Sequence, residues 1–267
     1  MSVFAGKVVV VTGASQGIGR ALCLELARQR PRLVLAARDA SQLELVAAEC
    51  RALGAQTLVV PTDVSLKADC DALIDLTLAH FGSLDVLVNN AGAGMIARFD
   101  ETEDLAVYES LMRVNYLSGV WLTHRALPAL KRDRGLIVAI SSLAGLAGVP
   151  TRTGYCASKH AMIGFFDALR AELHGSGVGV TIVCPDFVVS QIHKRALGPD
   201  GKPLGKSPMQ EAKLMTAEAC ARLTVRAMAK RERLAILSLR GRLGRFVRLI
   251  APGFIDGIAR RAARMGK

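Results

Sequence analysis

Short apolar runs rich in β-branched residues alternate with helical patterns over most of the chain. The apolar runs are Lys7–Thr12, Arg32–Ala36, Thr57–Pro61, Leu84–Val88, Gly135–Ile140 and Gly179–Val183. Apolar residues recur at helical spacing between them, over Gly17–Arg30, Ser41–Leu53, Ala68–Phe81, Leu105–Leu130 and Tyr155–His174. Strands separated by helices of this length form parallel sheets, because right-handed crossovers place helices on both faces. The sequence therefore predicts an α/β fold with a doubly wound parallel sheet.

The alternation meets no linker before a segment rich in glycine and proline at residues 198–203. A length of 267 residues is within the range that a single α/β domain reaches. We expect one domain over residues 1–239, with a flexible loop at about 187–215, followed by a basic amphipathic extension over residues 240–267. A helix after the loop is expected to be capped by Thr216.

The N-terminal sequence MSVFAGKVVVVTG has neither the basic region nor the apolar region of a secretory signal. No apolar stretch approaches the roughly 18 residues that cross a bilayer. The cysteines form no CxxC pair and no metal-ligand spacing, so we expect reduced, buried thiols and no metal site. They are Cys23, Cys50, Cys70, Cys156, Cys184 and Cys220. These features predict a cytoplasmic protein.

The positive charge is concentrated at the C-terminal end. Residues 222–267 hold thirteen basic and two acidic residues, a net charge of +11, against +12 for the whole chain. Within the extension Arg242, Arg245 and Arg248 alternate with apolar residues, a pattern typical of a helix that lies on an anionic membrane. Docking on the protein's own core or on a partner subunit is the alternative. Nucleic-acid binding is not expected, because the extension has just two aromatic residues, Phe246 and Phe254.

A glycine-rich segment, Gly13-Ala14-Ser15-Gln16-Gly17-Ile18-Gly19, joins the first strand to the first helix. A nucleotide-binding sheet of the Rossmann type needs glycines here for a tight turn and for close approach of the backbone to a pyrophosphate at the helix N-terminus. A turn that merely requires a positive φ would also explain two of the glycines. The residues predicted to contact the cofactor are Gly13, Ser15, Gln16, Gly17, Ile18 and Gly19.

The spacing of this segment is T-G-x-x-x-G-I-G, which differs from the dinucleotide fingerprint G-x-G-x-x-G. Further motifs follow in order between Gly6 and Ser190: Asp63-Val64, Asn89–Gly92, Asn115, Ser142, Tyr155-x-x-x-Lys159 and Pro185. With this set the chain resembles the short-chain dehydrogenase/reductase (SDR) family, and in particular its hydroxysteroid-dehydrogenase-like branch. Members of this family that resemble it are commonly dimers or tetramers, which implies a homodimer or homotetramer.

The resemblance implies further contacts with a nicotinamide cofactor. Asp63 and Val64 would flank the adenine, and Asn90, Ala91 and Gly92 would lie along the ribose side. Pro185 and Val188 would cover the nicotinamide ring.

Cofactor choice follows from charge at the end of the second strand. An acidic residue there accepts the ribose hydroxyls of NAD and repels the 2′-phosphate of NADP. This strand instead reaches Ala36 and is followed by Arg38, whose guanidinium suits a phosphate. NADP(H) is therefore favoured over NAD(H), although the following Asp39 leaves NAD(H) as an alternative.

Tyr155 and Lys159 are four residues apart on a predicted helix and so share one face. A nearby ammonium, together with a cationic nicotinamide, is expected to favour the phenolate of Tyr155. The resemblance assigns proton transfer to Tyr155 and the nicotinamide ribose to Lys159. By the same resemblance, Ser142 would hydrogen-bond the substrate oxygen, since twelve residues separate it from the tyrosine as in the family pattern. Asn115 would hold a water molecule of the proton relay. Taken singly, each residue has an ordinary alternative, such as a turn cap or a solvated amide.

Two departures from the family pattern lie near the substrate. Asp186 follows Pro185 where glycine is frequent, and Ser190 replaces a threonine. Asp186 is expected either to perturb the loop over the nicotinamide or to point into the substrate pocket. The pocket residues expected from sequence neighbourhood are Leu143, Ala144, Leu146, Val149, Phe187, Val189 and Ile192.

Together these features predict an NADP(H)-dependent oxidoreductase that moves a hydride between nicotinamide and a carbonyl or secondary alcohol. The apolar pocket favours a lipid-like or steroid-like small molecule. One alternative is a catalytically silent nucleotide-binding scaffold or membrane-surface protein. Another is an epimerase or dehydratase that uses the same residues with a tightly held cofactor.

Overall fold

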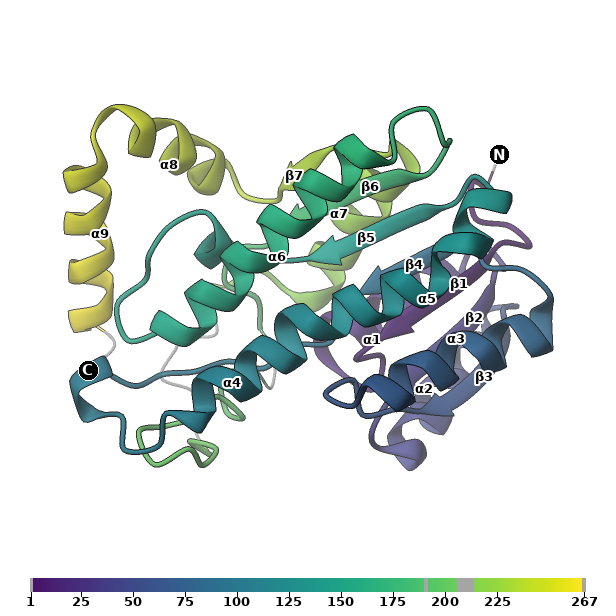
Figure 1. Ribbon diagram of the computed structural model, residues 1–267, viewed down its shortest axis with the longest axis horizontal. Coiled ribbons are helices and arrows are strands. Elements are labelled where there is room, and N and C mark those ends of the chain that lie inside the picture. Colours follow the sequence, from purple (N-terminus) through teal and green to yellow (C-terminus); the bar gives the residue numbers. More distant parts are fainter. Residues whose placement is uncertain (1, 190–191, 206–213, 266–267) are drawn as a thin grey trace.

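The computed structural model describes residues 2–189, 192–205 and 214–265, and the side chains of these up to Arg261. Its strands are β1 (Val8–Thr12), β2 (Arg32–Ala37), β3 (Gln56–Pro61), β4 (Val86–Asn89), β5 (Leu136–Ile140), β6 (Gly179–Cys184) and β7 (Leu234–Ile236). In the described part of the chain these seven strands form one parallel sheet in the order β3-β2-β1-β4-β5-β6-β7. The predicted doubly wound parallel sheet is confirmed (Figure 1).

Helices cover both faces of this sheet, and further helices lie beyond the carboxyl ends of its strands. The helices are α1 (Gly17–Ala27), α2 (Ala40–Ala52), α3 (Lys67–Phe81), α4 (Ala106–Met112), α5 (Ser118–Arg132), α6 (Thr153–Glu172), α7 (Ala217–Ala229), α8 (Leu239–Ile250) and α9 (Pro252–Met265). The short 3₁₀ turns are η1 (Phe99–Glu101) and η3 (Leu143–Gly145). None of the helices in the described part of the chain has both the length and the apolar character needed to span a membrane.

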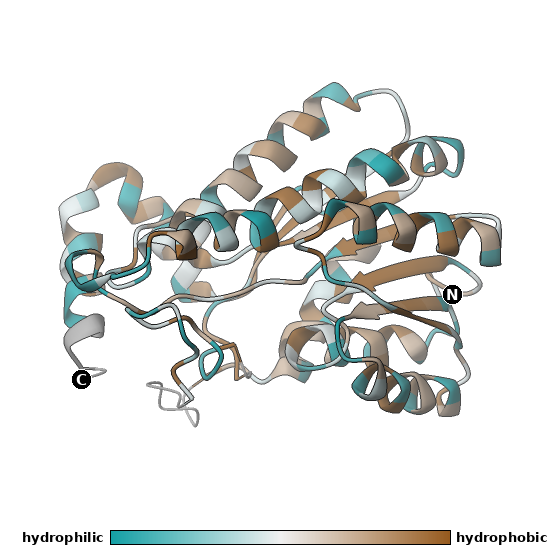
Figure 2. Cartoon of the chain, turned by 60° about the horizontal axis from the view of Figure 1, so that its bottom comes forward, coloured by the Kyte–Doolittle hydropathy of each residue, from teal (hydrophilic) through white to brown (hydrophobic). Residues whose placement is uncertain are grey.

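Strand β1 shows how the two layers are built. Val9 and Val11 pack toward α1, α2 and α7, whereas Val8 and Val10 pack toward α3, α5 and α6. Alternate residues of a strand face opposite sides, so a strand covered on both faces must be apolar throughout. Figure 2 shows the resulting sheet as apolar strands between two-toned helices. The six cysteines are buried and free, as predicted.

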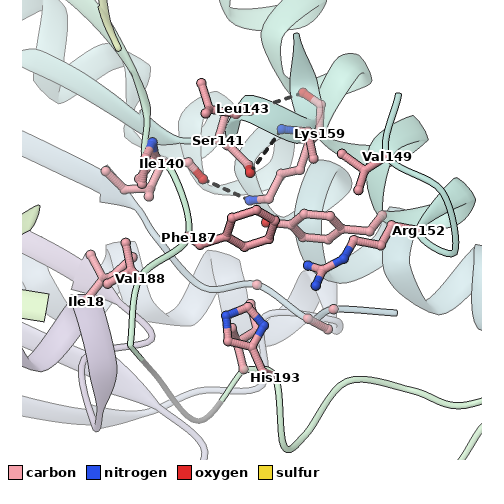
Figure 3. A pocket seen from close by; sticks show the side chains of 18 of the residues that line it. Ile18, Ile140, Ser141, Leu143, Val149, Arg152, Lys159, Phe187, Val188 and His193 are labelled. Carbon is pink, nitrogen blue, oxygen red and sulfur yellow. Dashed lines mark hydrogen bonds between the residues drawn. The ribbon is translucent and has the colours of Figure 1, made fainter. Parts of the chain in front are cut away.

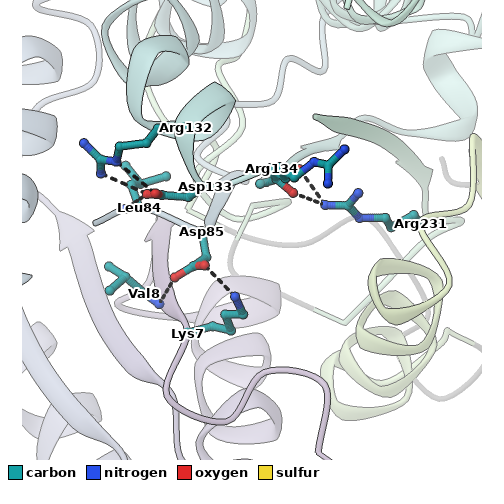
Figure 4. Close-up of polar contacts among 9 residues, drawn as sticks. Lys7, Val8, Leu84, Asp85, Arg132, Asp133, Arg134 and Arg231 are labelled. Atoms are coloured by element: carbon teal, nitrogen blue, oxygen red, sulfur yellow. Dashed lines mark hydrogen bonds and ion pairs between the residues drawn. The ribbon is translucent and has the colours of Figure 1, made fainter. Parts of the chain in front are cut away.

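Ion pairs and hydrogen bonds close the amino end of the sheet (Figure 4). Asp85 accepts from the ammonium of Lys7 at 2.8 Å and from the backbone amide of Val8 at 2.9 Å. Asp133 accepts from the amide of Leu84 at 3.2 Å. These contacts satisfy the polar groups at this edge, which leaves the opposite, carboxyl edge as the place where a ligand binds in such sheets.

Two elements differ from the sequence prediction. The long helix expected over Leu105–Leu130 is interrupted by a π-helical segment, η2 (Arg113–Leu117), between α4 and α5. Its apolar spacing resembles that of a continuous helix, so the pattern does not reveal it. The strand β7 was not predicted, because three residues are too few to show the alternation of apolar and polar residues that marks a strand.

The extension ends the chain as two helices, α8 and α9, that lie beyond the carboxyl ends of the strands (Figure 1). Gly241 in the first turn of α8 packs on Leu143 and Ile236, where a Cβ atom would come within 2.7 Å of Leu143. Leu239, Phe246, Leu249 and Ile250 of α8 are exposed and lie outside the lining of the cavity described below.

Candidate active site

One cavity of about 1450 Å³ runs along the carboxyl edge of the sheet, from the glycine turn to the helices α8 and α9. Every cofactor-contact residue predicted from the sequence lines it. These residues are Gly13, Ser15, Gln16, Gly17, Ile18, Gly19, Arg38, Asp63, Val64, Asn90, Ala91, Gly92, Tyr155, Lys159, Pro185 and Val188. Of the four predicted catalytic residues, Ser142, Tyr155 and Lys159 line it as well, whereas Asn115 lies buried behind Gly92.

The glycine turn brings two backbones into contact. Gly13 has φ +67° and Gly17 has φ +54°, in the left-handed region that glycine tolerates. Position 19 has room only for glycine, because a Cβ atom on Gly19 would lie 2.0 Å from the carbonyl oxygen of Gly13. Helix α1 begins at Gly17 with no side chain capping its first amides, which leaves these N–H groups free for a phosphate.

The hydroxyl of Thr12 holds this turn to the end of β4. It accepts from the amides of Asn90 and Ala91, both at 3.0 Å, and donates to the carbonyl of Val88 at 3.2 Å. The side-chain amide of Asn90 donates to the carbonyl of Thr12 at 2.7 Å. Asn90 is therefore a support of the turn as well as part of the cavity wall. The role of the Thr12 hydroxyl was not predicted from the sequence.

Charged residues gather where β2 ends. Arg38 follows β2 and is exposed to the cavity. The carboxylate of Asp39 caps α2, accepting from the hydroxyl of Ser41 at 2.7 Å and from the amide of Gln42 at 3.1 Å. These hydrogen bonds, and more weakly the charge of Arg195, lower the pKa of Asp39. Arg195 belongs to a loop far along the chain, so sequence reasoning missed it.

Ser142, Tyr155 and Lys159, which the sequence predicts to take part in proton transfer, line the same cavity. Ser142 ends the loop after β5, and a hydrogen bond links it to Tyr155 on α6. Burial raises the pKa of Tyr155, whereas the bond with Ser142 and the charge of Arg152 act in the opposite direction. The sequence predicts a stabilised phenolate. In the protein without bound nicotinamide the pKa of Tyr155 is instead raised, because desolvation outweighs the effects of Ser142 and Arg152.

Lys159 lies one helical turn beyond Tyr155 and is buried. Its ammonium donates to the carbonyl of Ile140 at 2.8 Å and lies 5.9 Å from the centroid of the Tyr155 ring (Figure 3). Burial lowers the pKa of Lys159 to about 8. The neighbouring Ser141 bonds to the backbone of Lys159 at 3.2 Å, which leaves Ser142 as the serine beside the tyrosine.

Asn115 sits in the π-helical segment and is buried. Its oxygen accepts from the amide of Ala93 at 2.8 Å, and its amide donates to the carbonyl of Ala93 at 3.0 Å and to the hydroxyl of Ser158 at 2.8 Å. The π-helical turn shifts this one side chain toward β4, a common device at functional sites. Asn115 thus joins the segment after β4 to α6, one residue before Lys159.

The far end of the cavity has many apolar side chains in its wall and is bordered by the extension. Six of the seven predicted pocket residues line it, and Val189 is not among its described lining. Leu243 and Val247 of α8 and Phe254 and Ile258 of α9 add to this wall. The sequence did not place the extension at the pocket, since only the fold shows where α8 begins.

Asp186 lines the cavity, which agrees with the second expectation from the sequence, but its carboxylate is engaged by the protein itself. Its side chain is 8% exposed and accepts from the guanidinium of Arg240 at 2.6 and 2.8 Å, and from the hydroxyl of Ser238 at 2.8 Å. Ser238 in turn caps α8. Asp186 therefore ties the first turn of α8 to the end of β6. Ser190, the other departure, lies outside the described residues.

The loop expected over residues 187–215 is described in part. Leu197 donates to the carbonyl of Gly94 at 2.9 Å and accepts from the amide of Ile96 at 2.9 Å, so this part of the loop pairs with the segment after β4. Thr216 caps α7 through the amide of Ala219 at 3.1 Å, as predicted.

Comparison with known proteins agrees with this arrangement. A family model for the short chain dehydrogenases matches residues 7–198. The chain is 39% identical over 235 residues to 11-beta-hydroxysteroid dehydrogenase A of Sesamum indicum, a match that covers 86% of this chain and 67% of the relative.

Two solved structures share the fold at 29% identity. One is a short chain dehydrogenase/reductase from Burkholderia phymatum in complex with NAD, with a TM-score of 0.83 over 95% of this chain and 96% of the other. The other is an alcohol dehydrogenase from the archaeon Thermococcus sibiricus complexed with 5-hydroxy-NADP, with a TM-score of 0.73 over 86% and 94%. With the glycine turn, the serine–tyrosine–lysine group and the matching family model, the chain belongs to the short-chain dehydrogenase/reductase family.

Proposed function

We propose that this protein is an NADP(H)-dependent oxidoreductase that interconverts a hydrophobic ketone or aldehyde and its alcohol, with Tyr155 as general acid and base. One observation carries the proposal. The hydroxyls of Ser142 and Tyr155 and the ammonium of Lys159 share one cavity with an open helix N-terminus. This arrangement supports proton transfer and cofactor binding on one continuous surface.

The residues fit a dinucleotide with a nicotinamide ring, which supplies a hydride when bound. The uncapped amides of α1 bind its pyrophosphate, and Lys159 binds the nicotinamide ribose. In the reductive direction Tyr155 donates its proton to the substrate oxygen, while Ser142 donates a hydrogen bond to the same atom. The raised pKa of Tyr155 keeps that proton in place at neutral pH. Asn115 holds α6 and the segment after β4 in register around Lys159.

The preference for NADP(H) rests on charge. Arg38 and Arg195 line the cavity at the end of β2, and the carboxylate of Asp39 is engaged as a helix cap. Two guanidinium groups bind a 2′-phosphate, whereas the ribose hydroxyls of NAD gain little from them. One structural neighbour was solved with NAD and the other with an NADP derivative, so the neighbours favour neither cofactor.

A variant with Arg38 and Arg195 both changed to alanine tests this preference by titration of protein fluorescence with each cofactor. We expect affinity for NADPH to fall by roughly 100-fold and affinity for NADH to change by less than about threefold, since charge-assisted bonds to the phosphate are lost. Equal losses for both cofactors would contradict the preference.

A hydrophobic substrate is supported by the apolar walls from η3, α8 and α9 and by the name of the sesame relative. The experiment is NADPH oxidation, followed at 340 nm, against a panel of lipid-like and steroid-like ketones and aldehydes, for the wild type and Tyr155→Phe. We expect turnover that the variant loses. NADPH binding without any turnover would favour a nucleotide-binding scaffold, and product without NADPH loss would favour epimerisation or dehydration.

For the extension of residues 240–267 we propose contact with an anionic membrane surface. Its arginines and its exposed Phe246, Leu249 and Ile250 combine positive charge with apolar area on the outer side of α8. Co-sedimentation with vesicles tests this: binding to phosphatidylserine-containing vesicles but not to phosphatidylcholine alone is expected. A stable dimer that buries these side chains and does not bind vesicles would assign the surface to a second copy instead. The cytoplasmic location and the homo-oligomeric state stay predictions, tested by fractionation and light scattering.

A further inference from the structure

The cavity opens to the surface between α8 and the loop that follows β5, which we call the η3 loop (residues 143–149). Gly148 of this loop and Leu243 and Gly244 of α8 all line the cavity. Gly148 is also exposed to solvent, and so is Leu243, at 58%. Because these residues face both the cavity and the solvent, the cavity reaches the surface along this edge of α8.

Helix α8 is fixed to the η3 loop at two points on one face. In its first turn Gly241 packs on Leu143 so closely that a side chain would not fit. Two turns later Arg248 donates a hydrogen bond to the carbonyl of Leu146. Positions seven apart lie on the same face of a helix. The helix therefore runs along the loop from its first turn to its last.

Gly244 lies on this same face, three residues after Gly241 and four before Arg248. A Cβ atom on Gly244 would meet no protein atom within 4 Å, whereas one on Gly241 would lie 2.7 Å from Leu143. On the facing loop Gly148 is equally open. A gap therefore separates the helix from the loop between their two contacts, with a glycine on each side of it.

Neither glycine is explained by the needs of the fold. Gly148 and Gly244 are both outside the positive-φ region, so their backbone conformation admits other residues. Neither is in close contact with another segment. Glycine inside a helix lowers stability relative to alanine, because it has more backbone freedom to lose on folding. The missing side chain at Gly244 thus costs α8 stability and leaves space open in the cavity wall.

The space beside the gap is apolar. Val247 of α8 and Phe254 and Ile258 of α9 line the same part of the cavity as Leu243. Phe254 is 64% exposed and Ile258 is 51% exposed, although both belong to the cavity wall. A ligand that removes such apolar surface from water gains affinity in proportion to the area covered. This wall therefore suits an apolar chain that continues outward from the cavity.

We infer that Gly244, with Gly148 across the gap, determines the length of substrate that the cavity accepts. The two missing side chains let the far end of an elongated apolar substrate pass from Tyr155 outward between α8 and the η3 loop. The inference rests on the proposed oxidoreductase function and adds that the substrate is elongated rather than compact. Gly244 acts on specificity and does not take part in proton transfer.

The test measures kcat and KM with NADPH for methyl ketones of six, ten and fourteen carbons, which differ in length alone. The proteins compared are the wild type, Gly244→Leu, Gly148→Leu and Gly257→Leu. Gly257 lies on α9, where a Cβ atom also meets nothing within 4 Å, but it is outside the cavity lining. It controls for the addition of a leucine side chain to a helix of the extension.

We expect kcat/KM of the wild type to rise at least about tenfold from six to fourteen carbons, because each added CH₂ buries apolar surface. Gly244→Leu should lower the ratio of kcat/KM for fourteen carbons to that for six carbons by roughly 10- to 100-fold, since the leucine fills the gap. Gly148→Leu should act in the same direction, and Gly257→Leu should keep the wild-type ratio.

Two kinetic results overturn the inference. One is a wild type whose kcat/KM does not increase with chain length. The other is an unchanged length ratio in Gly244→Leu, including an equal loss for all three ketones, which would make the gap a path of entry instead of a site for the chain. Urea denaturation checks that the gap is open. Gly244→Leu and Gly257→Leu should both be at least as stable as the wild type, because leucine favours a helix over glycine, and a loss confined to Gly244→Leu contradicts an open gap.

Calorimetry distinguishes failure of the proposed function from failure of this inference. If no ketone is reduced, binding of the six-carbon and fourteen-carbon ketones to the NADP⁺-loaded protein is measured for the wild type, Gly244→Leu and Gly257→Leu. Tighter binding of the longer ketone that Gly244→Leu alone weakens supports the role of the gap even without reduction. Equal binding of the two ketones by the wild type, or no binding of either, contradicts it.

Discussion

The glycine turn and the C-terminal extension lie at opposite ends of one cavity and are built in opposite ways. At the turn, backbones touch: a Cβ atom on Gly19 would lie 2.0 Å from a carbonyl oxygen. In the extension, large apolar side chains face outward, with Leu249 at 80% exposure and Phe246 at 64%. The first region is fixed by the protein's own contacts. The second exposes apolar surface that a membrane or another molecule could cover.

This contrast teaches where sequence change should affect folding and where it should affect only function. A region defined by close backbone contact has no room for added atoms. A region with exposed apolar faces loses little folding energy when one of them is removed.

The largest effect is expected at Gly19. Gly19→Ala should lower the free energy of unfolding by about 3 kcal/mol or more and weaken NADPH binding severely, because the methyl group collides with the backbone of Gly13. Gly164→Ala on α6, where no atom lies within 4 Å, should instead stabilise by about 0.5–1 kcal/mol. Urea denaturation measures both. Similar stabilities for the two variants would break the comparison.

The next largest effect is expected in the pH dependence of activity, through Lys159, which lies between the two regions. Its pKa of about 8 means that the ammonium is charged below that pH and loses its proton as the pH rises through it. We expect kcat/KM for reduction to be level at neutral pH and to fall up to about tenfold per pH unit above about 8. Lys159→Arg should remove this limb, since a guanidinium stays charged. A wild-type profile that is level to about pH 10 would contradict the assignment.

Asp186 tests the junction of the extension with the sheet. Asp186→Asn should cost about 1–2 kcal/mol, less than a fully buried pair would, because its partner Arg240 is 71% exposed and screened by water. Its control, Asp71→Asn, breaks the exposed pair with Lys67 and should change stability by less than about 0.5 kcal/mol. Thermal unfolding at neutral pH compares the two.

The same pair predicts a pH dependence. The hydrogen bonds from Arg240 and Ser238 outweigh burial, so the pKa of Asp186 in the folded protein is below its ordinary value. Its contribution is therefore present above about pH 4 and is lost as the pH falls through the folded-state pKa. In Asp186→Asn this part of the acid dependence should disappear.

The smallest effect on stability is expected on the outer face of α8. Leu249→Ser should change the free energy of unfolding by less than about 0.5 kcal/mol but reduce binding to anionic vesicles. Leu22→Ala on α1, a fully buried leucine, should cost about 2–5 kcal/mol. A large loss of stability in Leu249→Ser would show that α8 depends on this side chain for folding.

The same contrast explains what could be read from the sequence. The strands β1–β6 were predicted because they are buried on both faces and so must be continuously apolar, and the glycine turn because φ and contact demand glycine. Arg195 and Arg240 were not predicted, since only the tertiary structure brings the charge of Arg195 near Asp39 and pairs Arg240 with Asp186. The π-helical turn at Asn115 was hidden because one inserted residue barely disturbs an apolar period.

The most direct test of the central claim follows the hydride itself. The wild type and Tyr155→Phe are incubated with a hydrophobic ketone and with NADPH carrying deuterium at both C4 positions, and the alcohol is analysed by mass spectrometry. We predict one deuterium on the carbinol carbon of the wild-type product, and at least about a 100-fold slower reaction for Tyr155→Phe with NADPH binding retained. An alcohol without deuterium, or a Tyr155→Phe variant as fast as the wild type, would contradict hydride transfer assisted by Tyr155.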